Sequence, residues 1–385
     1  MNETTADNRK RIESVDLFRA FGIILMIMGH IKFGSVFDKW IHAFHMPMFF
    51  FVSGWFFRQK ESLGAQIRKL VRNLLIPYVV FELVQWAVLL IFIPEYRTLE
   101  VMRYVFWENT YKIPVASGAS GISPIPGAMW FLTALFLAEI LYIFLDRLLG
   151  QNWKLHAAVA VLAVLGMLLP RFLPFRLPWA LDAALTGLGF FHIARTVRGT
   201  KLEALFRLKW WLALIGLAVF TASILFCPAI NLRTGEYGWY APFWVNALGM
   251  IVALWNLAAA VEKLLTHGKV LRAVSAWLRN IGKNSIVYLC LNQSVILAGG
   301  DAWHVAGGVH TVGKHTCVIH LGVVLYVEVG GEFYTGTDIP FVVFEVNTDN
   351  GADGPSFLCA VQILVAHKTL QGTDGLKTVG AIGIL

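Results

Sequence analysis

The stretch RAFGIILMIMGH, residues 19–30, carries an arginine and a histidine at the two ends of an apolar run. Eleven residues of α-helix turn through about 1100°, so Arg19 and His30 are predicted to leave nearly the same face of one helix, roughly 16 Å apart along its axis. Ionisable groups are costly inside a bilayer, and an intramembrane pair is therefore a hypothesis of function. In the alternative interpretation, Arg19 extends to one membrane interface and His30 lies at the other.

The chemistry of these two side chains suits a reaction with an anionic ligand. Histidine takes and releases protons near neutral pH, so His30 is a candidate base. The guanidinium of Arg19 offers a planar fork of donors that fits phosphate. Asp16 stands one helical turn before Arg19 and is predicted to pair with it, which fits either interpretation of the pair.

The composition of the chain identifies its class. Of 385 residues, 57% are hydrophobic and 15% are charged, against roughly 25% charged residues in a soluble domain. Apolar runs of about 20 residues recur along the chain, as expected of membrane-spanning helices. The sequence therefore predicts an integral membrane protein. Its net charge of +8 is interpreted as topology information, not nucleic-acid binding, and its four cysteines have no metal-site spacing.

Nine apolar segments can be drawn between a polar N-terminal tail, residues 1–13, and residue 299. They predict an all-α, polytopic transmembrane helix bundle of about nine or ten helices over residues 14–299. The longest gap, residues 94–127, is rich in proline and glycine and is predicted to be an outer loop. The segments are about 14–33, 40–57, 74–93, 128–146, 155–170, 178–194, 210–229, 241–262 and 281–299.

The positive charges between these segments alternate from one side to the other. The N-terminal tail and every second gap together hold 20 lysines and arginines, whereas the remaining gaps hold 8. Cytoplasmic loops of membrane proteins carry the excess of positive charge. The alternation therefore predicts a cytoplasmic N-terminus.

The tail over residues 300–385 has a different composition. Residues 301–385 hold 3 basic and 8 acidic residues and 13 of the 34 glycines, and no run there reaches a membrane-spanning length. The stretches VIHLGVVLYVEV and IPFVVFEV are typical of short strands between glycine turns. Three interpretations stay open: a small extra domain, a disordered end, or the product of a shifted reading frame. The abrupt change in composition favours the last two.

The second segment holds further histidines. His42 and His45 are three residues apart and share a helical face, and Pro47 perturbs the helix beside them. Ser53 and Gly54 permit the close approach of another helix. His42 is interpreted as an interfacial residue, whereas function and packing are equally compatible with His45.

Other charged residues precede or interrupt the apolar segments. In IRKLVRNLLIPY, residues 67–78, Arg68 and Arg72 lie before a helix on the inner side. They are placed to bind phosphates of a cytosolic cofactor, although plain topogenic charge explains them as well. Glu82 and Glu139 lie deep in apolar segments and need a partner, because a lone buried carboxylate is costly.

The order of these motifs resembles that of a known family. RAFGIILMIMGH resembles the Arg-x10-His signature of the membrane acyltransferase-3 family, and the nearest group is the fucose 4-O-acetylase-like branch. The resemblance covers about residues 11–295, and the ordered set of motifs is fairly specific. Where the family often has a histidine late in the last motif, this chain has Asn292. The further motifs are FHMPMFFFVSGWFF, the basic stretch ending in LLIPY, MWFLTALF and GKNSIVYLCLNQ (282–293).

This resemblance implies an activity and its participants. It implies about ten transmembrane helices in the bacterial inner membrane, and an acyl-CoA co-substrate, usually acetyl-CoA, on the cytoplasmic side, with no permanently bound cofactor. The acceptor is a hydroxyl of a sugar or cell-envelope glycan. His30 is implied as the catalytic residue, and Arg19, with Arg68 and Arg72, as the donor-binding residues. The candidate supporting residues are Asp16, His45 and Glu139.

Two other classes of function remain as alternatives. A proton-coupled transporter or exporter would use the same intramembrane charges along a substrate path, with His30 as a proton relay. Transporters often show internal repeats and paired broken helices, and neither is legible in this sequence. A non-catalytic scaffold leaves Arg19 and His30 without a role.

Overall fold

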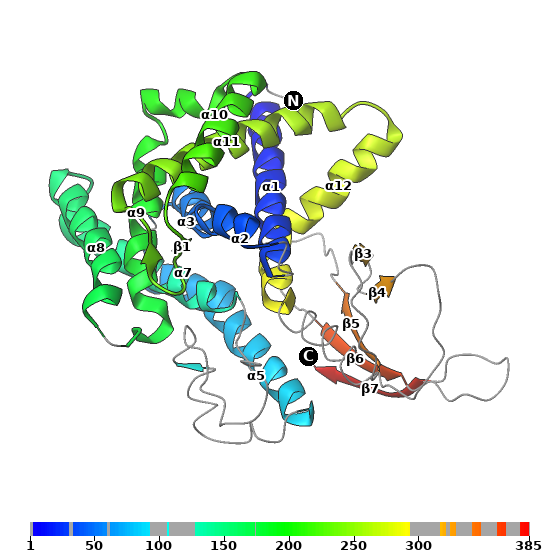
Figure 1. Ribbon diagram of the computed structural model, residues 1–385. Coiled ribbons are helices and arrows are strands. Elements are labelled where there is room, and N and C mark those ends of the chain that lie inside the picture. The colour runs from blue at the N-terminus through cyan, green and yellow to red at the C-terminus, as the bar shows by residue number, and fades with distance from the viewer. Residues whose placement is uncertain are drawn as a thin grey trace. The chain divides into compact units, whose positions relative to one another are not determined.

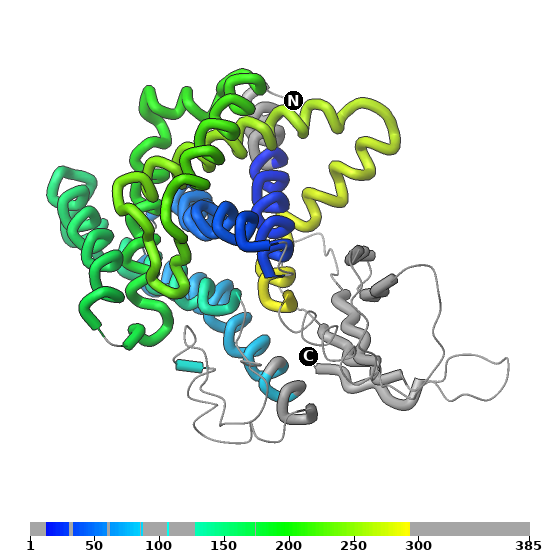
Figure 2. Tube along the Cα trace, in the orientation of Figure 1, coloured from blue at the N-terminus to red at the C-terminus, as the bar shows by residue number. Residues whose placement is uncertain are grey.

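The computed structural model describes residues 3–30, 34–59, 62–92, 106–107, 128–173 and 175–292, and five strands between residues 316 and 384 (Figure 1). Figure 2 traces the same chain in the same orientation. The predicted outer loop over residues 94–127 falls almost entirely outside the described residues. The chain divides into two compact units, Met1–Ser294 and Val295–Leu385. The first unit contains the motifs singled out above.

The first unit is built from helices (Figure 1). A π-helical turn, η1 (Val71–Leu75), joins the fourth helix to the fifth, and the 3₁₀ turns η3 (Pro178–Ala180) and η4 (Lys201–Arg207) precede later helices. Residues 285–292 are also helical. In chain order the labelled helices are α1 (Glu3–His30), α2 (Ser35–His42), α3 (His45–Phe56), α4 (Leu63–Leu70), α5 (Ile76–Phe92), α7 (Trp130–Leu149), α8 (Trp153–Phe172), α9 (Leu181–Val197), α10 (Trp210–Phe226), α11 (Tyr240–Leu265) and α12 (Lys269–Lys283).

The first helix is continuous from Glu3 to His30, so Arg19 and His30 lie on one helix as predicted. α1 packs against α11 and α12. At Gly282 of α12 a side chain would overlap the backbone carbonyl of Asp16. This close approach fixes the part of α1 that carries Asp16 and Arg19.

The predicted segment 40–57 is two helices rather than one. α2 ends at His42, Ala43 and Phe44 form a turn, and α3 begins at His45. Pro47 lies in the first turn of α3, where its missing N–H leaves no intrahelical bond unmade. The break therefore falls where the sequence predicted a perturbed helix.

Aromatic side chains from α3 form the centre of the first unit. Phe50, Phe51 and Trp55 are almost fully buried. The ring of Trp55 lies 4.9 Å from that of Phe206 and 5.1 Å from that of Trp255 on α11. α3 also packs against α9, and a side chain at Gly54 would overlap the backbone of that helix. The prediction that Gly54 permits a close helix approach is confirmed.

The helices differ in their fitness to span a membrane. Among the described residues, α8 and α11 are long and apolar enough to cross a bilayer. η4 and α10 meet the same test together, but they are bent by 93° relative to each other. α9 has 17 residues and a length of only about 26 Å, below the roughly 30 Å of a hydrocarbon core. Length and apolarity therefore support two or three spans.

The segment predicted over 281–299 begins differently in the structure. α12 starts at Lys269, and a turn at Asn284 separates it from the helical residues 285–292. α12 buries Ser275 and Ile281 on one side and exposes Val270 and Arg272 on the other. A search for continuous apolar runs misses such a helix, because its apolar residues recur only on one face.

The second unit contains five strands. β3 and β4 pair antiparallel, and β5, β6 and β7 form an antiparallel sheet in that order. Of these strands, β4 lies within the stretch VIHLGVVLYVEV, β3 overlaps its start, and β5 overlaps the stretch IPFVVFEV. Their bounds are β3 (Thr316–His320), β4 (Val324–Glu328), β5 (Phe341–Asn347), β6 (Ala360–Ala366) and β7 (Thr378–Ile384).

Candidate functional site

A polar cavity of about 330 Å³ lies at the C-terminal end of α1. Three separate segments supply its walls: the end of α1, the α2–α3 region and the loop between α10 and α11. Trp130, the first residue of α7, adds an aromatic side chain. The polar side chains that line the cavity are His30, Asp38, His42, His45, Asn231 and Arg233.

The three histidines of this cavity share one hydrogen-bonding arrangement. In each, Nδ1 lies within hydrogen-bond distance of the backbone carbonyl four residues earlier. A carbonyl oxygen only accepts, so Nδ1 carries the proton and Nε2 keeps its lone pair in the neutral ring. Each histidine is therefore oriented as a base through Nε2. The bonds join His30 to Met26 at 2.8 Å, His42 to Asp38 at 2.7 Å and His45 to Ile41 at 2.7 Å.

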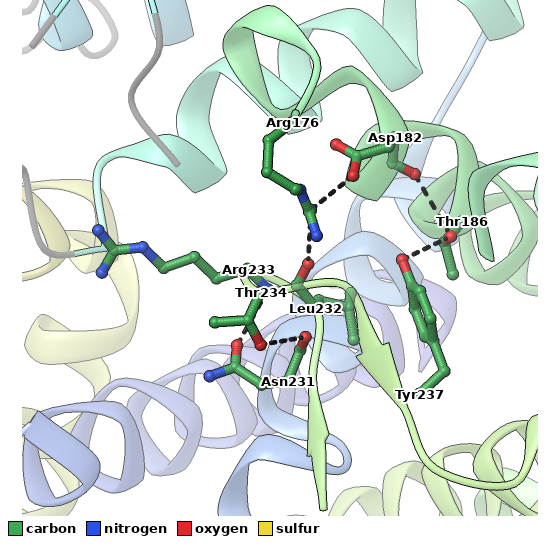
Figure 3. A network of polar contacts seen from close by, with 8 residues as sticks. All are labelled: Arg176, Asp182, Thr186, Asn231, Leu232, Arg233, Thr234 and Tyr237. Atoms are coloured by element: carbon green, nitrogen blue, oxygen red, sulfur yellow. Dashed lines mark hydrogen bonds and ion pairs between the residues drawn. The ribbon is translucent and has the colours of Figure 1, made fainter. Parts of the chain in front are cut away.

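A short hairpin in the loop between α10 and α11 forms the third of these walls. β1 (Ile230–Asn231) pairs antiparallel with β2 (Glu236–Tyr237). Arg176 forms an ion pair of 2.6 Å with buried Asp182 and donates a hydrogen bond of 3.2 Å to the carbonyl of Leu232 in the hairpin turn (Figure 3). At the other strand, the hydroxyl of Tyr237 lies 3.0 Å from that of Thr186. These contacts fix the hairpin to α9 and to the segment before it.

The turn of the hairpin depends on a glycine. Gly235 has a φ of +77°, and a side chain there would overlap the guanidinium of Arg176. The amide oxygen of Asn231 accepts a hydrogen bond of 3.0 Å from the backbone N–H of Arg233. The side chain of Arg233 extends away from the Arg176–Asp182 pair (Figure 3). The turn therefore presents Arg233 to the cavity.

Arg233 brings a positive charge into this cavity. Burial lowers the pKa of its guanidinium to about 10, so it stays protonated at neutral pH. Its Nη2 is buried and has no hydrogen-bond partner among the residues that the structure describes. The same holds for Oδ1 of Asp38. The charge of Glu82, on α5, acts on Arg233 as well, which gives that deep carboxylate the cationic neighbour that the sequence required.

A second cluster of charges lies about 16 Å along α1 from the cavity. Arg19 is half-buried and forms a 3.6 Å ion pair with Asp16, as predicted. Its guanidinium lies 5.7 Å from the ring centroid of Phe56, at the end of α3. The guanidinium of Arg198 lies at the same distance from that ring and donates a 2.6 Å hydrogen bond to the carbonyl of Trp55. Two arginines therefore meet at one exposed aromatic ring.

The other predicted site residues lie outside the cavity lining. Arg68, on α4, and Arg72, on η1, are exposed. Both α4 and η1 pack against α7, the helix that carries Glu139. The charge of Lys69 acts on Glu139 across this contact. The structure thus brings His30 and His45 together, and separately Arg19 and Asp16, but it keeps the basic stretch apart from the histidines.

Comparison with known proteins decides the family. The model of the acyltransferase-3 family, described as an acyltransferase domain, matches residues 12–308, which is most of the chain. The chain belongs to the acyltransferase-3 family. No curated protein and no solved structure matches it. As a member of this family it is a membrane acyltransferase. The matched residues include those of the cavity and those of the charge cluster at Arg19.

In this acyltransferase Asn292 lies close to the C-terminal end of α1, which carries His30. Its side chain is buried, and Nδ2 lies 3.4 Å from the sulfur of Met26. The carbonyl of Met26 is the group that accepts from His30. The position that often holds a histidine in the family therefore contacts the turn of α1 that orients His30.

Sequence reasoning missed several residues of this acyltransferase's two clusters. Asp38, Asn231 and Arg233 flank apolar segments, and the charge alternation marks Arg233 only as one of the 8 positive charges of the outer gaps. His42 lines the cavity, which the interpretation as a merely interfacial residue did not anticipate. The sequence contains one signal for this hairpin turn. In INLRTG, residues 230–235, Arg233 stands between Asn231 and Gly235, and asparagine and glycine are common in turns. Nothing in the sequence linked Arg198 to Arg19.

Proposed function

We propose that this membrane acyltransferase moves an acyl group, acetyl in the simplest case, from acyl-CoA to a hydroxyl of a sugar or cell-envelope glycan. We place it in the fucose 4-O-acetylase-like branch. The observation that carries the proposal is the cavity at the end of α1, where His30 presents a basic Nε2 beside polar side chains that suit a hydroxylated ligand. The family match supplies the acyl-transfer chemistry.

His30 acts as the general base in this proposal. Its Nε2 takes the proton of the acceptor hydroxyl as the oxygen attacks the thioester carbonyl carbon. The new C–O bond forms, the C–S bond breaks, and the thiolate leaves with the proton returned by the imidazolium. The hydrogen bond from Nδ1 to the carbonyl of Met26 holds the ring in the tautomer that this step needs.

The donor binds at the arginine cluster in this proposal. Arg19 and Arg198 converge on Phe56 and offer two guanidinium forks to the phosphates of CoA. Asp16 orients Arg19 through its ion pair. The roughly 16 Å between Arg19 and His30 leaves room for the flexible arm of CoA to carry the thioester from the phosphates to the base.

The remaining predicted residues take supporting roles. Arg68 and Arg72 are exposed and available to an incoming anionic donor, and Glu139 faces the charge of their neighbour Lys69. His45 packs edge-on against His42, with 5.1 Å between the ring centroids, and lines the same cavity as His30.

The topology belongs to the same proposal. A bundle of nine or ten helices in the bacterial inner membrane, with a cytoplasmic N-terminus, places the arginine cluster inside and the histidine cavity on the outer side. The charge alternation along the sequence supports this orientation.

One assay separates acyl transfer from the transporter alternative. Purified protein is incubated with radiolabelled acetyl-CoA and a panel of sugars, and in parallel it is reconstituted into liposomes with the same sugars outside. Label on a sugar hydroxyl supports the enzyme. Accumulation of unmodified sugar in the liposomes, without acetyl transfer and above protein-free liposomes, would favour a transporter.

A further inference from the structure

The cavity contains two buried polar atoms that call for a ligand. Oδ1 of Asp38 accepts hydrogen bonds only, and Nη2 of Arg233 donates them only. Within the described part of the chain neither atom has a hydrogen-bond partner. A buried polar group without a partner costs about 1–3 kcal/mol, and more when it is charged. Both atoms lie on side chains that line the same cavity, so a ligand there can satisfy both.

The backbone at both positions is held by the surrounding structure. Asp38 lies inside α2, and its backbone carbonyl receives the hydrogen bond from His42. Arg233 lies in the hairpin turn that Arg176 fixes through the carbonyl of Leu232. The backbone that carries each group is therefore in place before a ligand enters, which lowers the conformational cost of binding.

The charges of the cavity balance. Arg233 contributes one positive charge to the cavity lining and Asp38 one negative charge. The carboxylate of Glu82 also acts on Arg233. An anionic ligand would meet Asp38 as a like charge. A neutral ligand that both donates and accepts hydrogen bonds avoids that repulsion, and a hydroxylated compound does both.

The size and the aromatic wall narrow the ligand further. About 330 Å³ is at the lower end of the range of ligand pockets, which suits a single ring rather than a chain of rings. The buried indole of Trp130 lines the cavity and provides an apolar surface for the C–H face of such a ring.

We propose that the cavity binds one neutral sugar unit, with Asp38 accepting a hydrogen bond from one hydroxyl, Arg233 donating to another, and Trp130 packed against the ring. The inference rests on the proposed function for the role of this sugar as acceptor. It adds the substrate class, neutral rather than acidic, and the residues that select it.

The test compares neutral and acidic sugars of equal ring size. Methyl glycosides of a neutral 6-deoxyhexose and of a uronic acid are titrated into the purified protein by calorimetry and supplied as acceptors with acetyl-CoA. We expect the neutral glycoside to bind and to be acetylated. In Asp38→Asn and Arg233→Met, we expect the Kd and the KM for the neutral glycoside to rise about tenfold or more, with the KM for acetyl-CoA unchanged.

Two controls make the result decisive. Glu236→Gln alters an exposed side chain of the same hairpin and should leave both constants unchanged. If Arg233→Met fails to fold, Arg233→Lys takes its place. This variant keeps the positive charge but loses the planar fork of guanidinium donors, so it should still raise the KM for the neutral glycoside. Preference for the uronate, or unchanged binding in both cavity variants, would overturn the inference. Binding that depends on Asp38 and Arg233 without any acetyl transfer would refute the proposed function alone.

Discussion

Replacing Arg176 tests whether the hairpin is fixed as the structure indicates. Arg176→Met keeps the length and the apolar stem of the side chain but removes the guanidinium that pairs with Asp182 at 2.6 Å. The side chain of Asp182 is only 2% exposed, so the variant leaves a buried carboxylate without its cation. Breaking such a pair from one side costs about 3–5 kcal/mol.

The expected loss is large enough to measure in detergent. At about 2 °C per kcal/mol for a chain of this size, Tm should fall by about 6–10 °C. Tm is measured from the intrinsic tryptophan fluorescence of the protein on heating. The matched control is Arg207→Met, because Arg207 forms a 3.2 Å ion pair with Glu203 but its side chain is 68% exposed. An exposed pair contributes less than about 1 kcal/mol, so this control should shift Tm by no more than about 2 °C.

A second substitution tests the cause of that loss. Asp182→Asn in the Arg176→Met background removes the orphaned charge, and the double variant should regain most of the lost Tm. Equal shifts in Arg176→Met and Arg207→Met, or a double variant less stable than Arg176→Met, would refute the reasoning.

Two further predictions concern packing and donor binding. Gly54→Leu should prevent correct packing of α3 on α9 and lower the yield of folded protein, whereas Gly64→Leu, at a site with open space, should fold normally; equal yields would contradict this close contact. Arg19→Ala and Arg198→Ala should each raise the KM for acetyl-CoA about tenfold without changing the KM for the acceptor. The reason is that each variant removes one guanidinium group at the ring of Phe56. An effect of Arg19→Ala alone would exclude Arg198 from donor binding.

The sequence predicted the helical class and several local features of the first unit correctly. Hydrophobic runs identify buried helices because apolar side chains must leave water. Arg19 and His30 share a continuous helix, Asp16 pairs with Arg19, and Gly54 meets another helix. These predictions succeed because each depends on residues of one helix or on the small size of a glycine. The turn that separates α2 from α3 was anticipated only as a perturbation near Pro47.

The cavity itself could not be predicted, because it depends on contacts between distant segments. Arg233 is about 200 residues from His30 along the chain, and the hairpin that carries it is fixed by Arg176 and Asp182. Local patterns contain no information on which segments meet. The same reason explains Arg198, which lies with Arg19 at the ring of Phe56, at the end of α3.

Substitution of His30 tests the central claim most directly. His30→Gln retains an amide that can donate to the carbonyl of Met26 but cannot take a proton from the acceptor. Acetyl transfer by the purified variant should fall by about 10²- to 10⁴-fold in kcat, with its Tm and its KM for acetyl-CoA unchanged. His267→Gln, at an exposed histidine beyond α11, should keep full activity. A His30→Gln variant that transfers acetyl groups at close to the wild-type rate would contradict the account.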